Sequence, residues 1–187
     1  MNINAISDKG GNRIILCELD PSLNVLTPPV HGVNALDAGY ILQSSFEQKA
    51  AKEQFKSEDG LVRAVDYSYE TRTTAILMQR DKTLVDFLTQ TVKGKLYLQY
   101  HYRGIAGAKY QEIFSVVKVT PQTKIDTPGA AKSFPYEAVH MVVDASLTIS
   151  SAVISAIESE LDVDIKTSGP VVIPSGKEFV IVETDVS

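Results

Sequence analysis

The run Leu61–Met78 constrains the fold of this chain more than any other sequence feature. Its odd-numbered positions from Val65 to Leu77 carry aromatic, β-branched or apolar residues, while the even-numbered positions from Asp66 to Arg72 are polar. A period of two places these two sets on opposite faces of a β-strand. The run is about three times the usual strand length. We therefore expect either two strands around a bulge or a β arm that extends beyond the core.

Local signals predict further elements around this run. Leu84, Leu88 and Val92 recur at helical spacing, so we expect a helix capped by Asp81 that ends before Lys93-Gly94. Alternating patterns predict a first strand, then an antiparallel hairpin joined by the loop 104–109, and then a strand after a polar loop that contains Pro and Gly. These four strands are Arg13–Leu19, Lys95–Arg103, Tyr110–Thr120 and Phe134–Val143.

The segment 22–60 has little periodicity. Pro28-Pro29 interrupts it, and only the stretch Phe46–Lys56 is rich in helix-forming residues. Such a long, weakly patterned segment in a compact domain usually binds a partner or is disordered. We predict that 22–60 is a long interaction loop, mobile in the free chain, with a helix at Phe46–Lys56.

The last 42 residues have a different pattern. A helix is expected at Ser150–Leu161, with a serine as its N-cap. Short strands are expected at Asp162–Lys166, Val171–Ile173 and Glu178–Glu183, the last two joined by Pro174–Lys177.

These elements predict an α+β, mainly β fold. We expect an antiparallel β-sandwich or barrel with one flanking helix, a long loop or β arm, and an α-β-β C-terminal element. The β-rich domain would span residues 1–145, and residues 146–187 would pack on it as a helix and hairpin. The chain shows no alternation of strands and helices, so a doubly wound nucleotide-binding fold is not expected.

Composition narrows the classes of function. The formal charge is −5, so there is no overall positive field to hold nucleic acid or an anionic membrane. Cys17 is the only cysteine, which excludes an internal disulfide and a metal site built from several cysteines. No apolar stretch reaches the roughly 18 residues needed to cross a bilayer. We expect a chain made in a reducing cytoplasm that makes no membrane contact.

Few residues could perform neutral-pH chemistry. The three histidines are His31, His101 and His140, and one of them could activate Cys17 as a nucleophile. Cys17 lies in an apolar strand, however, where a buried and inert thiol is commoner. We expect structural roles for all four residues and predict no catalytic, cofactor-binding or metal-binding residue.

Three further patterns have both a functional and a structural reading. Asp162 and Asp164 share one face of a predicted strand and could bind a divalent ion, but a solvated strand end is the expected role, as it is for Glu158 and Glu160. Gly104-Ile-Ala-Gly107 matches a short nucleic-acid-binding pattern but joins strands, so hairpin geometry is expected. Tyrosines alternate in Lys95–Arg103 like a base-stacking platform, yet Leu96, Leu98, Tyr100 and Tyr102 form an apolar packing face.

The order of elements from about Gly60 to Val143 resembles a known family. This part of the chain is similar to the tail tube proteins of long-tailed bacteriophages and to the inner-tube proteins of contractile injection machines. The shared order is a long alternating strand, a short helix, a tyrosine-rich hairpin and a strand after a Pro/Gly loop. The resemblance implies two packed antiparallel sheets with a flanking helix, and a hairpin and a loop that reach neighbouring subunits. It also implies rings, commonly of six copies, that stack into a hollow tube.

From this resemblance we expect a structural virion protein and not an enzyme. It would assemble with itself and with other tail proteins in the host cytoplasm and reside in the virion tail. DNA would pass through the lumen without specific binding, because acidic residues repel phosphates. Candidate lumen residues are Asp66, Glu70 and Glu112. The alternatives are another tail or capsid component, such as a terminator, adaptor or decoration protein, or a non-viral binding domain of OB or sandwich type.

Overall fold

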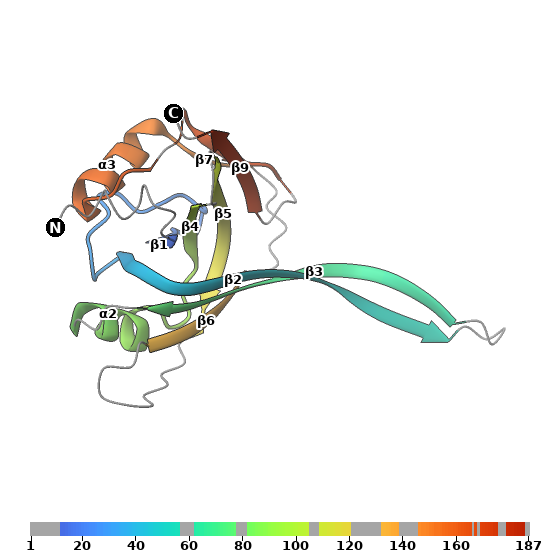
Figure 1. Ribbon diagram of the computed structural model, residues 1–187. Helices are drawn as coiled ribbons and strands as arrows, with labels where there is room; N and C mark the ends of the chain where they lie inside the picture. Colours follow the sequence, from blue (N-terminus) through green and yellow to red (C-terminus); the bar gives the residue numbers. More distant parts are fainter. Residues whose placement is uncertain are drawn as a thin grey trace.

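One antiparallel sheet of seven strands organises the molecule, with the strand order β4-β1-β2-β3-β6-β5-β9 (Figure 1). The structure is a computed structural model and describes residues 12–56, 62–77, 82–104, 109–120, 132–138, 146–165, 167, 169–175 and 179–185. The sheet strands are β1 (Asn12–Glu18), β2 (Ala35–Lys56), β3 (Val62–Leu77), β4 (Tyr97–Gly104), β5 (Lys109–Val119), β6 (Lys132–Ala138) and β9 (Phe179–Asp185). The other elements are α2 (Lys82–Asp86), the π-helix η1 (Phe87–Thr91), β7 (Leu147–Ile149), α3 (Ser151–Leu161) and β8 (Val171–Ile173).

The sheet curls back on itself. β4 pairs with β5 along Tyr97–Gly104, which brings the first strand of the order next to the sixth. β5 and β6 meet only over Val117–Val119, because β9 occupies the rest of that edge of β5. The result is a strongly curved sheet and not a closed barrel. The predicted α+β, mainly β class with a flanking helix is confirmed.

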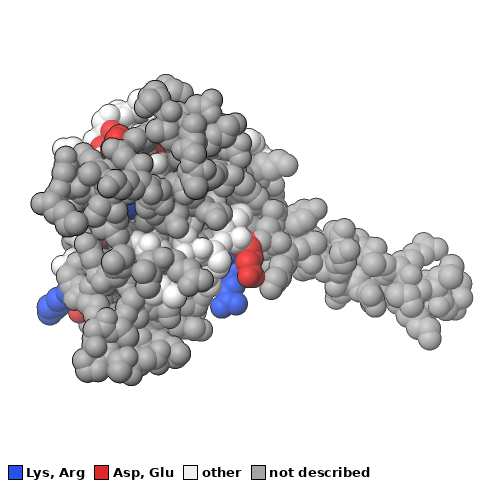
Figure 2. All heavy atoms as spheres, in the orientation of Figure 1, with Lys and Arg blue, Asp and Glu red and all other residues white. Residues whose placement is uncertain are grey.

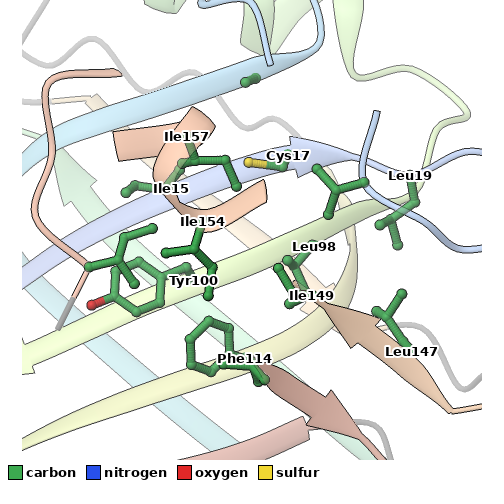
Figure 3. Close-up of a cluster of buried hydrophobic side chains, with 14 of the residues drawn as sticks. Ile15, Cys17, Leu19, Leu98, Tyr100, Phe114, Leu147, Ile149, Ile154 and Ile157 are labelled. Carbon is green, nitrogen blue, oxygen red and sulfur yellow. The ribbon is translucent and has the colours of Figure 1, made fainter. Parts of the chain in front are cut away.

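Both faces of the curved sheet are buried, each under a different helix. On one face, apolar residues of β1, β4 and β5 pack against α3, β7 and β8; we call this the α3 core (Figure 3). On the other face lies a second cluster, the α2 core, into which α2 and η1 contribute Leu84, Phe87 and Leu88. Alternation sorts the strands between the two cores: Ile15 and Cys17 of β1 belong to the α3 core, and Ile14 and Leu16 to the α2 core.

The helical segment expected after the long strand is present and covers the α2 core. Its second half is a π-helix, and Val92 donates its N–H to the carbonyl of Phe87 at 3.2 Å. Gly94 follows with a φ of +76°, as the sequence signal for the helix end predicted. The predicted cap Asp81 lies outside the described residues.

The prediction for residues 22–60 is wrong in its second half. Residues 35–56 form β2, so Phe46–Lys56 is a strand and not a helix. The stretch contains good helix formers, but its backbone pairs with β3 from Ile41–Leu77 outward to Lys56–Val62. Pairing along the whole length outweighs a helix propensity of a few tenths of a kcal/mol per residue.

The C-terminal residues also differ from the prediction. Helix α3 begins after the cap Ser150, whose Oγ accepts the N–H of Val153 at 3.3 Å, as expected. The predicted strand at 162–166 is absent from the described residues 162–165, because Asp162 is left-handed with a φ of +50° and Glu158 Oε1 accepts the N–H of Ile165. β8 and β9 do not pair with each other: β8 pairs with β7, which was not predicted, and β9 pairs with β5. The predicted hairpin is therefore absent, and β9 belongs to the main sheet.

Candidate functional site

The most distinctive feature of the structure is a two-stranded arm, the outer parts of β2 and β3 (Figure 1). β1 pairs with β2 only up to Ile41, and β6 pairs with β3 only from Thr71 to Leu77. Beyond these points, residues 43–56 of β2 pair only with β3, and residues 62–70 of β3 pair only with β2, among the described residues. The long alternating run is thus one strand that continues from the sheet into an arm, and the pairing contains a register shift near Ala51–Lys52.

Residues of opposite charge stand opposite each other along the arm. The register pairs Glu47 with Arg72, Lys49 with Glu70, and Lys52 with Asp66. Directly opposed charges of this kind stabilise antiparallel pairs by roughly 0.2–1 kcal/mol each. Glu47 and Arg72 are exposed, and Figure 2 shows an acidic and a basic group next to one another where the arm leaves the body.

Polar side chains inside the body connect β4 to the base of the arm. Ser44 Oγ of β2 lies 3.3 Å from Nε2 of His101, which is completely buried. Gln99, also fully buried, directs Nε2 towards Thr73 Oγ1 of β3 at 3.5 Å. The Ser44 contact connects His101 of β4 to the base of the arm.

Sequence reasoning missed this polar set. Thr73, Gln99 and Ser115 are at most 2 % exposed, and Gln99 and Ser115 are register partners across β4 and β5. The available signal was the interruption of apolar alternation on the Tyr97 face of β4 by Gln99 and His101. The sequence pattern predicts a packing role only for the opposite face, with Leu98 and Tyr100, whereas the curl of the sheet buries the Tyr97 face too.

Cys17 is not arranged for catalysis. It is 3 % exposed in the α3 core, and burial raises the pKa of its thiol to about 12 (Figure 3). His101 pairs in register with Ile14, whose side chain belongs to the opposite core. His31 is exposed in the segment before β2, and His140 lies outside the described residues. Cys17 and His101 thus face opposite cores, and His31 is exposed whereas Cys17 is buried.

The tyrosine-rich strand cannot offer a stacking surface. Tyr97 is fully buried against Phe87 in the α2 core, and Tyr100 packs on Phe114 in the α3 core. Tyr102 is 7 % exposed. The predicted packing role of the face that carries Leu98, Tyr100 and Tyr102 is confirmed, and the opposite face with Tyr97 is buried as well.

One candidate lumen residue is corrected by the structure. Glu112 is completely buried, and its Oε1 accepts a hydrogen bond from the Tyr100 hydroxyl at 2.9 Å. It shares the face of β5 that carries Phe114 and Val116, which α3 helps to cover. Glu112 therefore cannot line a lumen. Asp66 and Glu70 are placed only as register partners of lysines on the arm.

Three of the four acidic residues in the last turn of α3 and just after it are solvated, as expected, whereas Glu158 is half-buried. Asp162 and Asp164 are exposed and alternate with the buried Val163 and Ile165, and Glu160 is exposed on the helix. Glu158 closes the turn after the helix through its bond to Ile165. Within the described part of the chain, no three His, Cys, Asp or Glu side chains are grouped closely enough to hold a metal ion. Of the Gly104–Gly107 loop, only Gly104, the last residue of β4, lies among the described residues.

The segment between β1 and β2 is held by its own hydrogen bonds. Asp20 Oδ1 accepts the N–H groups of Ser22 and Asn24, at 2.7 and 3.0 Å. The carbonyl of Val30 accepts the N–H groups of Val33, Asn34 and Ala35, each at 3.1 Å. This segment therefore has a defined conformation in the single chain.

Among the described residues, no helix has both the length and the apolar character needed to cross a bilayer. No protein-family model matches the chain, and no curated protein matches it either.

Proposed function

We propose that this chain is a structural subunit that assembles with copies of itself through the β2–β3 arm. The observation that carries the proposal is the arm, which leaves the body with both of its long edges unpaired among the described residues. A two-stranded ribbon alone is at best marginally stable in water, whereas addition to another sheet satisfies its free backbone groups. Such an arm is best explained by a neighbouring subunit that receives it.

The form of assembly that we propose is a closed ring. The arm and the surface that receives it are different parts of the chain, so each contact is head-to-tail, and a head-to-tail contact closes into a ring when its rotation permits. Stacked rings would make a tube of the phage-tail type, in keeping with the resemblance of residues 60–143 to tail tube proteins. In this proposal the subunits, commonly six to a ring, surround a lumen through which DNA passes during genome delivery. The subunit then resides in the virion tail with other tail proteins.

Truncation of the arm tests the proposal. Replacing residues 49–70 with Asn-Gly joins the register partners Gln48 and Thr71 through a two-residue turn that suits a hairpin. No described residue of either core lies between Ile41 and Ala75, so the body should keep its fold. Negative-stain imaging should show rings or tubes for the full chain and only single subunits for the truncated chain.

A change far from the arm provides the control. Val172→Ser alters an exposed apolar residue on β8 and should leave assembly as in the unmodified chain. Rings formed equally well by the truncated chain would refute the role of the arm. A full chain that remains monomeric at every concentration would refute the proposal as a whole.

A further inference from the structure

The unpaired strand edges in the described part of the chain include one at the end of the main sheet and two along the arm. The sheet order ends at β9, which pairs only with β5. The other two edges are those of the arm, one along β2 from Gln48 to Lys56 and one along β3 from Val62 to Glu70. Unpaired N–H and C=O groups on such edges are templates for an additional strand.

The charges on these edges differ in sign. β9 carries Glu183 and Asp185 and no Lys or Arg. The outer β2 edge carries Lys49, Lys52 and Lys56 against the single acidic residue Glu53 in the range 48–56. The outer β3 edge carries Arg63 against Asp66 and Glu70 in the range 62–70, so it shares the negative sign of β9.

We infer that the outer β2 edge of one copy pairs with the β9 edge of the next copy, an inference that rests on the proposed self-assembly. Opposite charges attract across paired strands, and like charges directly opposite are destabilising. Two β9 edges, or two outer β2 edges, would each place charges of the same sign together. The charge pattern therefore disfavours a symmetric dimer and selects the head-to-tail contact that a ring requires.

The spacing of the lysines allows the outer β2 edge to oppose unlike charges to β9 in more than one register. Lys49, Lys52 and Lys56 recur every three or four residues, and β9 has seven residues, so a lysine falls beside β9 wherever it lies along this edge. A long side chain also reaches the diagonal neighbour across a strand pair. The backbone supplies the hydrogen bonds of the contact, and the charges choose which edges meet.

The test reverses the charge of one edge at a time. The arm variant carries Lys49→Glu and Lys52→Glu, together with Glu70→Gln and Asp66→Asn, so that no like charges oppose each other within the arm. The edge variant carries Glu183→Lys and Asp185→Asn; asparagine is used at the second position because Asp185 is the register partner of Lys109. Each variant alone should need about tenfold more protein for half-maximal assembly, as measured by light scattering.

Mixing the two variants in equal amounts should restore assembly. In an alternating arrangement, each reversed arm meets a reversed edge, and each native arm meets a native edge. A matched control with only Glu70→Gln and Asp66→Asn keeps the lysines and should assemble like the unmodified chain. Far-UV circular dichroism of each variant verifies that the body is folded.

The outcomes distinguish a failure of the β2–β9 contact from a failure of the proposed self-assembly. If either folded variant assembles at the concentration of the unmodified chain, or if the mixture of two folded, assembly-deficient variants fails to recover, the β2–β9 contact is wrong while self-assembly stands. If the unmodified chain does not assemble, both fall together.

Discussion

At the scale of single residues, the curved sheet decides what each reactive side chain can do. Cys17 and His101 lie on adjacent strands, yet alternation sends their side chains to opposite faces. The thiol is in an apolar core with a raised pKa, and the imidazole is near a serine at the base of the arm. The fold therefore keeps the thiol and the imidazole on opposite faces of the sheet.

We predict a measurable pH effect of Cys17. Burial raises its pKa from 9.0 to about 12, so above about pH 9 the unfolded chain loses this proton while the folded chain keeps it. The free energy of unfolding should therefore fall with rising pH, by at most about 1.4 kcal/mol per pH unit from this residue. Urea unfolding at about pH 8 and about pH 10.5 should show a smaller fall for Cys17→Val than for the unmodified chain.

Tyr97 does not obscure that comparison. Its pKa is raised by burial and secondarily by Glu18, and it contributes a loss of stability at high pH to both proteins. Equal falls in the two proteins would mean that the Cys17 thiol ionises in the folded state. Rapid reaction of the native thiol with a disulfide reagent at neutral pH would contradict the assignment independently.

At the scale of elements, two glycines show how a loop and a helix are joined. Gly32 and Gly94 have φ values of +79° and +76°, which side chains with a Cβ rarely adopt. A Cβ on Gly94 would meet no atom within 4 Å, whereas a Cβ on Gly32 would lie 2.5 Å from Cγ2 of Thr83 on α2. The segment before β2 is thus in close contact with the first turn of the helix.

We predict unequal costs for substitution at these two positions. Gly94→Ala should destabilise the chain by about 1–2 kcal/mol, because only the left-handed conformation is penalised. Gly32→Ala should cost more, since it adds a clash with Thr83. In the Thr83→Ser background, which lacks Cγ2, the cost of Gly32→Ala should fall towards that of Gly94→Ala. Chemical denaturation of the four variants measures these differences, and equal costs in both backgrounds would exclude the contact.

At the scale of the whole molecule, stability should be unevenly distributed. Both cores lie in the body, and the outer arm has only one strand-to-strand pairing among the described residues. A two-stranded segment without a third strand opens easily, so its amides should exchange quickly in the free subunit.

Hydrogen exchange followed by mass spectrometry should therefore separate the arm from the segment before β2. In monomers, we expect fast exchange in residues 43–56 and 62–70 and slower exchange in 20–35, where the hydrogen bonds are defined. Mobility was predicted for the whole range 22–60, and it is now expected only in the part that belongs to the arm. Assembly should protect the arm. If the arm were as protected in monomers as in assemblies, it would be stable without a neighbour, and the physical argument for assembly would fail.

The sequence by itself determined the elements whose signals are local. Alternation in Leu61–Met78 specifies a long strand, and Ser150 with the apolar spacing of Val153, Ile154 and Ile157 specifies α3. The helix end at Gly94 and the β4–β5 hairpin are of the same kind, because the residues that cause them are neighbours in the chain. The arm is the main part of the candidate site. The sequence predicted it only as one of two interpretations of the unusually long strand, the other being two strands around a bulge.

Only the tertiary structure decided the pairings between distant segments. Phe46–Lys56 is a strand because β3 lies beside it, and β9 joins β5 although β8 precedes it closely in sequence. The polar residues Gln99 and His101 are typical of a solvent-exposed strand face, but the curl of the sheet buries them. A strand completes its hydrogen bonds with whichever edge the fold presents, so its partner depends on the arrangement of the whole chain and not on its own residues.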